Sequence, residues 1–430
     1  MSEFVPEGWV IQPIQELLDN KVILKVQDGN HGSLYPKTSE FVDNGVPLVA
    51  ASHINLFGKI NFGACPKLTK ERASSLRIKP AQGGDVLLTH NATVGRVAVI
   101  PDLWDEVVVS TSTTYYRVDS SFLFNNYLYY YFQSPVFSEQ LKRIMGQTTR
   151  NQVPITAQKE LLITLPIYQE QKKIAAILTS VDDVIEKTQA QIDKLKDLKT
   201  GMMQELLTRG VGVDGKPHTE FKDSPVGRIP KGWEVEVIGN IFSVQLGKML
   251  SKASKITDSP LPYLGNKNIQ WGRVVLDDLE RMDFSEKEKK KFSLEAGDLL
   301  MCEGGDVGRC AIWMNEMSDC YYQKAIHRLR PVENKYKPVL LMEYMKFAKE
   351  SGLLVDYISQ TSIAHLTKEK LISIPIPVPS IVEQESIVKV LKALSNRLKV
   401  AENKLEQNKK LKKALMQDLL TGKKRVKVDS

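Results

Sequence analysis

Two polar clusters lie at matching places in the two halves of the chain, and each follows a Gly-Asp and a short apolar run. They are residues 89–96, Thr-His-Asn-Ala-Thr-Val-Gly-Arg, and residues 302–309, Cys-Glu-Gly-Gly-Asp-Val-Gly-Arg. Asn and Gln can pair with adenine, Arg and Lys with guanine, and Asp or Glu can accept a hydrogen bond from cytosine. These residue types therefore suit base reading. The signal for phosphate-binding glycine loops is weak in both clusters, because turns that connect strands explain Gly95 and Gly308.

Two further pairs of polar segments differ in composition where they correspond, namely 28–37 with 245–252 and 146–152 with 359–365. We select candidate DNA-contacting residues from these segments, from the two clusters and from two nearby polar pairs. In the first half the candidates are Asn30, His31, Lys37, Thr89, His90, Asn91, Thr148, Thr149, Arg150 and Asn151. In the second half they are Lys248, Lys252, Lys267, Asn268, Glu303, Arg309, Gln323, Lys324, Thr361, Ser362 and His365. For each residue taken singly, the alternative to a DNA contact is a solvated surface side chain.

Signatures of enzyme chemistry are absent from the sequence. It contains no GxxxxGK[ST] phosphate loop, no HExxH, no CxxC pair and no aminomethyltransferase tetrapeptide. The six histidines are scattered without metal-ligand spacing. The four cysteines fit neither a secreted disulfide framework nor a zinc module, so we expect buried free thiols. We predict no catalytic residue, no metal site and no cofactor on this chain.

The elements that position the candidate segments occur twice along the chain. The shared motifs are Pro-x-Gly-Trp (6–9 and 230–233), Gly-Asp-(Val/Leu)-Leu (84–87 and 297–300) and Pro-x-x-x-Glu-Gln (166–171 and 379–384). From the second motif onward the offset stays at 213 residues, which is the separation of Gly84 from Gly297. The chain is therefore a tandem duplication.

The hydrophobic pattern changes once within each repeat. Short β-branched runs such as 86–88, 96–100 and 107–110 are typical of strands, and 127–144 is expected to be one helix behind them. The rest of each repeat carries an a/d heptad seam. The seam residues are Ile174, Leu178, Val181, Ile185, Ile192 and Leu195 in the first copy, and Ile387, Leu391, Leu394, Leu398 and Leu405 in the second.

Each seam predicts a helix of about 40 residues, roughly 60 Å long, whose apolar stripe must be buried. We expect the two helices to pair antiparallel as a coiled coil; the alternative is that each docks separately on its own domain. The predicted fold is α+β, with two tandem mixed α/β domains joined by two long helices in pseudo-two-fold symmetry. The predicted parts are 1–165 (first domain), 166–208 (first helix), 209–229 (linker), 230–378 (second domain) and 379–425 (second helix and basic tail).

Length and charge agree with this organisation. At 430 residues the chain exceeds what one core usually organises. The longest uncharged stretch, 120–138, is interrupted by polar residues and proline, so we expect no membrane span, and the acidic N-terminus favours a cytoplasmic protein over a secreted one. Residues 397–427 carry eleven Lys or Arg against three Asp or Glu, which equals the whole net charge of +8. A basic face suits nucleic acid or an acidic partner, or is simply a solvated helix.

Taken together, the repeated motifs resemble the specificity subunits of Type I restriction-modification systems. The segment 218–233, His-Thr-Glu-Phe-Lys-Asp-Ser-Pro-Val-Gly-Arg-Ile-Pro-Lys-Gly-Trp, closely matches that family, and the likeness spans nearly the whole chain. The resemblance implies two target recognition domains, each reading one half of a split asymmetric site in double-stranded DNA. It also implies helices that set the spacing and seat two modification (adenine methyltransferase) subunits, with restriction subunits joining outside.

The same resemblance implies a chain without enzyme activity of its own. S-adenosylmethionine, and ATP and Mg for restriction, would then be bound by the partner subunits. Three alternatives remain from the residues: the specificity module of a methylation-only system, a coiled-coil scaffold that binds only protein, and a catalytic fusion, which the missing motifs disfavour.

Overall fold

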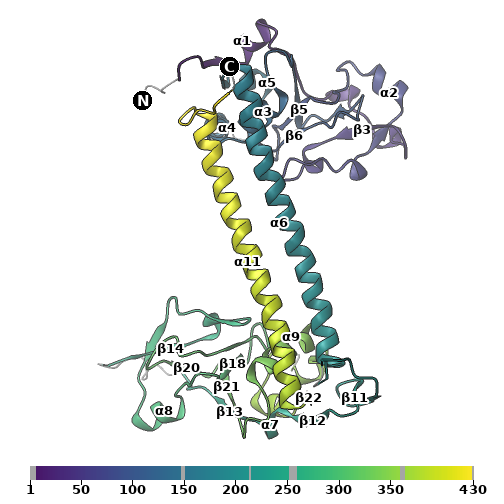
Figure 1. Cartoon of the computed structure of the whole chain (residues 1–430). Coiled ribbons are helices and arrows are strands. Elements are labelled where there is room, and N and C mark those ends of the chain that lie inside the picture. Colours follow the sequence, from purple (N-terminus) through teal and green to yellow (C-terminus); the bar gives the residue numbers. More distant parts are fainter. Residues whose placement is uncertain (1–5, 147–150, 213–214, 251–258, 359–363, 429–430) are drawn as a thin grey trace. The chain divides into compact units, whose positions relative to one another are not determined.

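The computed structural model describes residues 6–146, 151–212, 215–250, 259–358 and 364–428 of the chain. The chain divides into two compact units: unit 1 is Met1–Ala190 with Asn403–Ser430, and unit 2 is Gln191–Glu402. Each unit holds one mixed α/β domain together with one end of each of two long helices (Figure 1).

The domain of unit 1 contains a four-stranded sheet of order β2-β8-β5-β6, a three-stranded sheet of order β4-β3-β7 and the antiparallel pair β1-β9. The strands are β1 (Val10–Pro13), β2 (Ile23–Gln27), β3 (Val46–Val49), β4 (Lys67–Leu68), β5 (Val86–Thr89), β6 (Val97–Val99), β7 (Val108–Val109), β8 (Thr113–Val118) and β9 (Leu162–Leu165). The helices are α1 (Ile14–Asp19), α2 (Lys70–Ser75), α3 (Asn125–Phe132), α4 (Pro135–Met145) and α5 (Ile155–Lys159).

The domain of unit 2 repeats this plan. Its four-stranded sheet has the order β13-β21-β18-β19, its three-stranded sheet the order β17-β14-β20, and β12 pairs with β22. The strands are β10 (Phe221–Lys222), β11 (Ile229–Pro230), β12 (Glu234–Val237), β13 (Phe242–Leu246), β14 (Leu261–Leu264), β15 (Ile269–Gln270), β16 (Arg273–Val274), β17 (Glu280–Met282), β18 (Leu299–Cys302), β19 (Cys310–Ile312), β20 (Tyr321–Tyr322), β21 (Ile326–Pro331) and β22 (Pro375–Val378). The helices are α7 (Ile238–Ile241), α8 (Glu286–Lys291), α9 (Pro338–Glu350) and α10 (Lys368–Ile372).

The strand that follows each Gly-Asp motif is buried on both faces. In β5, Val86 and Leu88 belong to the core that includes the helices, whereas Leu87 belongs to the core shared with the three-stranded sheet. In β18, Leu299 and Leu300 divide between two cores in the same way. Successive strand residues point to opposite faces, so a strand buried on both sides reads as an unbroken apolar run.

The predicted single helix over 127–144 is wrong in its continuity. The segment forms two helices, α3 and α4, with a break at Gln133 and Ser134. Pro135 lacks the backbone N–H that a continuing helix needs, and the Ser134 hydroxyl instead accepts a hydrogen bond from the Phe137 amide at 3.1 Å. Proline at the first position and serine at the cap therefore begin a new helix.

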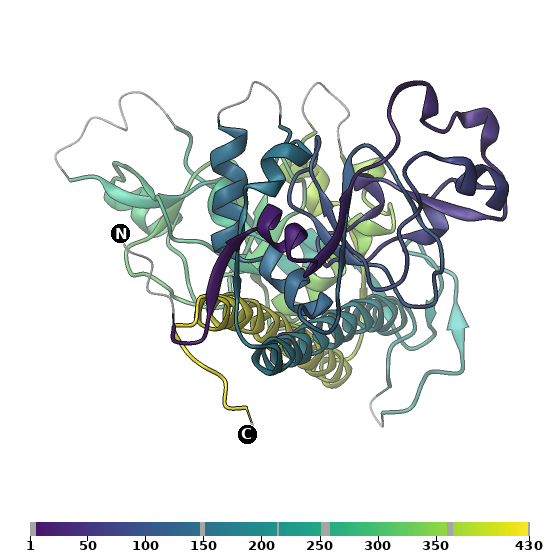
Figure 2. The same ribbon diagram turned by 90° about the horizontal axis from the view of Figure 1, so that it is seen from above.

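The two long helices, α6 (Tyr168–Thr208) and α11 (Ile381–Leu420), lie side by side (Figures 1 and 2). In unit 1 the start of α6 shares a core with the end of α11, as Leu178 and Leu419 illustrate. In unit 2 the end of α6 shares a core with the start of α11, as Leu206 and Leu391 illustrate. The antiparallel pairing expected from the heptads is confirmed. The alternative of separate docking is also partly right, because these cores include the domains.

Burial along the predicted seam agrees with the antiparallel pairing of α6 and α11. Eight seam residues are buried, namely Ile174, Leu178, Ile185, Ile192, Ile387, Leu391, Leu394 and Leu405. Val181, Leu195 and Leu398 are only partly buried. Ile185, Ile192 and Leu405 are buried although they lie outside the two cores that include the domains. The stripe pattern therefore predicts which side faces inward but not how completely each position is covered.

The Pro-x-Gly-Trp and Pro-x-x-x-Glu-Gln motifs meet in each unit. The indole Nε1 of Trp9 donates to Glu170 Oε2 at 2.9 Å, and that of Trp233 donates to Glu383 Oε2 at 2.9 Å. Both carboxylates are buried, with exposed fractions of 1% and 2%. A buried carboxylate is tolerated only with hydrogen-bond donors around it, so these bonds fix the start of each long helix against its own domain.

The glutamine that follows each glutamate ties down a second loop. The side-chain amide of Gln171 donates to the carbonyls of Pro166 and Phe122 and accepts from the Phe124 amide at 2.9 Å. Gln384 makes the corresponding three bonds in unit 2. Each Glu-Gln pair thus joins the first turn of a long helix to the loop before the domain's own helix.

The further partners of the two glutamates come from the segment that follows the other long helix. Arg425, beyond the end of α11, forms an ion pair with Glu170 at 2.9 Å. Beyond the end of α6, His218 Nε2 lies 2.9 Å from Glu383 Oε1, which also accepts from the amides of Val211 and Gly212. Burial alone would raise the pKa of Glu383, but these bonds and the one from Trp233 outweigh it and lower the pKa from its ordinary 4.5.

A charge in the seam should destabilise the chain strongly. Leu405 is 9% exposed and Leu411, on the same helix, is 50% exposed. Leu405→Asp places an unpaired carboxylate in the core and should lower the free energy of unfolding by about 3 kcal/mol or more, whereas Leu411→Asp should change it by about 0.5 kcal/mol or less. Urea unfolding of both variants tests this. Equal losses of unfolding free energy in the two variants would mean that the seam is not buried in solution.

The glutamate at the start of α11 should give unit 2 a pH-dependent stability. Because the pKa of Glu383 is lower in the folded state, its carboxylate stabilises the fold above about pH 4.5, and this contribution is lost as the pH falls through the folded-state value. Glu383→Gln should cost about 1–3 kcal/mol at neutral pH. The thermal midpoints of wild type and variant should converge between about pH 7 and about pH 3. Glu402→Gln, at an exposed position of α11, is the control. A difference between the two thermal midpoints that does not change with pH would contradict the stabilising role of the Glu383 carboxylate.

Candidate nucleic-acid interface

In unit 1 the candidate segments come together at the ends of three neighbouring strands. Asp28 follows β2, His90 follows β5 and Thr114 lies near the start of β8. The Nδ1 of His90 lies 2.8 Å from Thr114 Oγ1, and its Nε2 lies 4.0 Å from Asp28 Oδ2. Asp28 also binds His31 Nε2 at 2.8 Å. Burial lowers the pKa of His90, partly offset by the nearby carboxylate of Asp28, so the imidazole is neutral at pH 7.

A third segment of unit 1 completes this cluster. Asn91 forms a backbone bridge with Gln152, and the amide of Ala92 donates to the carbonyl of Asn151 at 3.1 Å. Residues from 28–31, 89–92 and 151–153 therefore lie together.

Unit 2 brings its own candidates together in a corresponding way. Lys248 bridges to Gln323, and the Lys324 amide donates to the Lys248 carbonyl at 2.7 Å. Gly304 bridges to His365, which is the counterpart of the bridge between Asn91 and Gln152. The two clusters thus share a backbone frame, while the residues exposed on it differ.

Several candidates hold the frame together instead of facing outward. Asn30 is 3% exposed and exchanges two hydrogen bonds with the backbone of Ile78. Thr89 is fully buried and accepts from the Arg96 amide at 2.9 Å. Asn268 is 2% exposed and accepts from the Gly265 amide while donating to the Val275 carbonyl. These side chains stabilise loops from within.

Two basic candidates of unit 2 are likewise engaged with the protein. Lys248 Nζ lies 2.7 Å from Glu288 Oε2 and 5.0 Å from the centre of the Phe284 ring. Arg309 Nη2 donates to the Asn266 carbonyl at 2.8 Å. Their charges are partly satisfied before any ligand binds.

His90 is also buried, with 2% of its surface exposed, and the remaining described candidates are accessible. His31, Lys37, Asn151, Lys267 and Lys324 are exposed, and Asn91, Glu303, Gln323 and His365 are partly exposed. Lys267 forms an ion pair with Asp278 at 2.8 Å. Six predicted residues, Thr148, Thr149, Arg150, Lys252, Thr361 and Ser362, lie outside the described residues.

Sequence reasoning left out Asp28, which joins His31 and His90. Its position was a signal, because it opens the first variable polar segment. The candidates from the sequence also include no residue of the hairpin formed by β15 and β16, which carries Trp271 and Arg273.

The described part of the chain contains no group of three or more His, Cys, Asp or Glu side chains placed to hold a metal ion. None of its helices has both the length and the apolar character needed to cross a membrane. The four cysteines are free and buried, as the sequence predicted, and burial raises the pKa of Cys65 to about 11.

Comparison with known proteins identifies relatives over most of the chain. A family model described as the Type I restriction modification DNA specificity domain matches residues 25–197 and 230–411. The MjaVIII specificity subunit of a Type I restriction enzyme from Methanocaldococcus jannaschii is 30% identical over 308 residues, covering 68% of this chain and 70% of that protein. The MjaIX specificity subunit from the same organism is 25% identical over 313 residues, covering 69% of this chain and 68% of that protein.

Solved structures with the same fold cover nearly the whole chain. A chain from a study of complex assembly and conformational transition of the Type I restriction-modification system has a TM-score of 0.60 at 18% identity, covering 97% of this chain and 98% of that one. The HsdS subunit from Thermoanaerobacter tengcongensis has a TM-score of 0.50 at 20% identity, with the same coverage of both chains. At these identities the likeness shows the fold.

Proposed function

Because the chain belongs to the family of Type I restriction-modification specificity subunits, and is thus a non-catalytic DNA specificity subunit, we propose that each of its two domains reads one half of a bipartite asymmetric DNA site. Residues 1–165 form the first target recognition domain and residues 230–378 the second. The helices set the spacing between the half-sites, and the protein acts in the cytoplasm.

The observation that carries this proposal is a common frame with unlike loops. The two four-stranded sheets have the same strand order, and the loops after β5 and β18 make corresponding bridges. At the same offset, however, the partly exposed Asn91 stands where the second copy has Gly304, and Gln152 where it has His365. Different polar side chains on one frame support recognition of different bases by one mode of docking.

The accessible residues are the proposed DNA contacts. In the first domain we assign His31, Lys37, Asn91 and Asn151, and in the second Lys267, Glu303, Gln323, Lys324 and His365. Lys37 and Lys324 suit phosphate or guanine, and the amides suit adenine. The six candidates outside the described residues, Thr148, Thr149, Arg150, Lys252, Thr361 and Ser362, complete the proposal.

The helix pair supplies the docking surface for two modification subunits, through which restriction subunits join. S-adenosylmethionine is bound by the modification subunits, and ATP and Mg by the restriction subunits. These assignments rest on the family and on the missing catalytic motifs of this chain.

The purified chain should neither methylate nor cleave DNA by itself. Adding the modification subunit of its own system should give adenine methylation that depends on S-adenosylmethionine and on one bipartite sequence, measured by methylation mapping. Robust methylation by the chain alone, in a preparation free of host methyltransferase, would contradict the assignment. A scrambled duplex is the control for sequence dependence.

Each domain should determine only its own half-site. Exchange of residues 297–310, or of a larger part of the second domain, for the same region of a relative should alter one half of the methylated sequence and leave the other intact. The matched exchange of 84–97 should alter the opposite half. Mapping the methylated sites of both chimaeras tests this prediction. A change in both halves of the site by either exchange would show that the domains do not read separately.

The helix pair should act as a ruler. Four residues inserted after Lys196 in α6 and after Arg397 in α11 lengthen both helices by about 6 Å and nearly preserve the heptad stripe. The methylated site should keep both halves and gain about two base pairs in its spacer, because each base pair occupies about 3.4 Å of the axis. An active variant with the original spacer would show that the helices serve for docking alone.

A further inference from the structure

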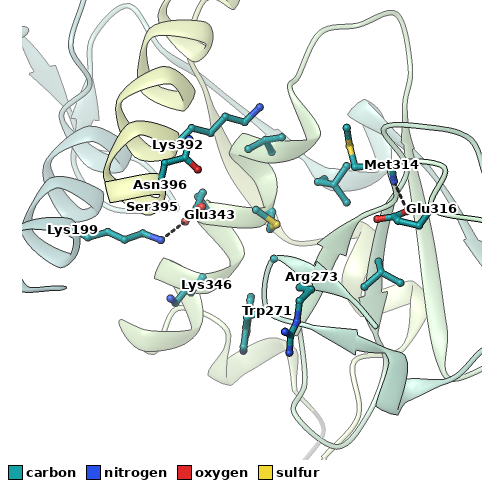
Figure 3. A pocket seen from close by; sticks show the side chains of 15 residues that line it. Lys199, Trp271, Arg273, Met314, Glu316, Glu343, Lys346, Lys392, Ser395 and Asn396 are labelled. Carbon is teal, nitrogen blue, oxygen red and sulfur yellow. Dashed lines mark hydrogen bonds and ion pairs between the residues drawn. The ribbon is translucent and has the colours of Figure 1, made fainter. Parts of the chain in front are cut away.

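A cleft of about 480 Å³ lies in unit 2 between the helix pair and the domain. Figure 3 shows its two sides: Lys199, Lys392, Ser395 and Asn396 come from the long helices, and Trp271, Arg273, Met314 and Glu316 from the domain, with α9 between them. None of these residues takes part in the proposed base reading.

The cleft has an excess of positive charge. Lys199 lies 4.0 Å from Glu343, and the Glu316 carboxylate accepts from the backbone amide of Met314 at 2.8 Å. Arg273, Lys346 and Lys392 have no ion-pair partner among the residues that the structure describes. Three cations around one concave surface favour an anionic ligand.

The counterpart in unit 1 is smaller, and its charges are paired. A cleft of about 180 Å³ lies between the loop 56–59 and the helix pair. Lys412 forms an ion pair with Asp182 at 2.7 Å, and Lys59 pairs with Glu186. Lys412 and Lys199 are equivalent by the offset of the repeats.

The repeat offset identifies helix positions at which the charge of unit 2 differs from that of unit 1. Asp182 corresponds to Ser395 and Glu186 to Lys399, so the second copy has lost both carboxylates that neutralise this surface in the first. In addition, Lys346 and Lys392 stand where the first copy has Gln133 and Thr179, so the positive charge of the unit 2 cleft results from these two lysines together with the absent carboxylates.

Apolar side chains form much of the cleft's lining. Val339 and Met342 from α9 and Ile312 from β19 are partly exposed there, and Met314 at the edge is 66% exposed. DNA phosphates would satisfy the cations but leave this apolar surface in water, and a duplex cannot enter a cleft that holds only a few side chains. A peptide with both acidic and apolar side chains would satisfy both.

We propose that this cleft docks an acidic, amphipathic segment of a partner protein chain, and that it does so in unit 2 only. The proposal rests on the proposed function in one respect, since the partner is sought among the subunits of the complex. The occupant would place carboxylates against Arg273, Lys346 and Lys392 and an apolar side chain against Met342.

The first experiment identifies the occupant directly. The full chain carrying photoreactive benzoylphenylalanine at Met314 is assembled with the modification subunit of its system and its DNA, irradiated, and analysed by mass spectrometry. A cross-link to a partner peptide rich in Asp or Glu and apolar residues is expected, and no such cross-link from Leu103, which is 77% exposed in unit 1. A cross-link to DNA, or none to protein, would overturn the proposal.

The second experiment tests the charges. The double variant Lys346→Glu, Lys392→Glu should weaken binding of the modification subunit about tenfold and reduce its salt dependence. The variant Lys346→Arg, Lys392→Arg should bind as wild type does, and so should Lys287→Glu, Lys290→Glu, which makes the same charge change at exposed positions of α8. Unchanged thermal midpoints show that the variants are folded.

The outcomes separate this proposal from the proposed function. If the wild-type complex fails to methylate DNA, the proposed function is wrong. If it methylates and the Lys346→Glu, Lys392→Glu variant binds the modification subunit normally, the cleft proposal alone is wrong. A variant that loses DNA affinity while assembling normally would make the cleft a DNA contact and would also overturn the proposal.

Discussion

The structure depends on a buried carboxylate at the start of each long helix. Glu170 and Glu383 are nearly inaccessible to water, so each must collect donors from the protein. One donor is the indole of Trp9 or Trp233, and others come from the segment that follows the opposite helix. A single carboxylate thus joins a domain's first strand, the start of one helix and the end of the other. The antiparallel register of the helices follows from this requirement as much as from the heptads.

Each buried carboxylate must be satisfied, but neither the number nor the identity of its donors beyond the tryptophan is the same in the two units. Glu170 is satisfied by the guanidinium of Arg425, whereas Glu383 takes an imidazole and two backbone amides. The motifs Pro-x-Gly-Trp and Glu-Gln therefore recur in both repeats while the segments after the helices differ. The sheets differ in this respect, because Asp85 and Asp298 both bind an arginine, Arg117 or Arg330, through both carboxylate oxygens.

Features that repeat along the chain could be predicted from the sequence, and features that depend on a three-dimensional neighbour could not. The duplication, the buried strands after Gly-Asp and the helix pairing all follow from patterns at fixed spacing. By contrast, the side-chain amide of Asn30 is satisfied by the backbone of Ile78, 48 residues along the chain, and that of Asn268 by Gly265 and by Val275 on the far side of the β15–β16 hairpin. No pattern in their own segments separates them from exposed amides. Leu195 and Leu398 fit the heptad, yet only the nearby packing decides how far they are covered.

The frame and the variable surface are separated because the strands of the frame are held by contacts within the domain. β5 and β18 are buried on both faces, and Arg96 and Arg309 each donate to a backbone carbonyl of the neighbouring hairpin or turn. With the strands held in this way, accessible loop residues can change, so Asn91 and Gly304 occupy one place in two sheets of the same strand order. The helix surface beside the domain obeys the same rule. Asp182 and Ser395 lie outside the buried seam, so a change there alters the charge presented to a partner and leaves the fold intact.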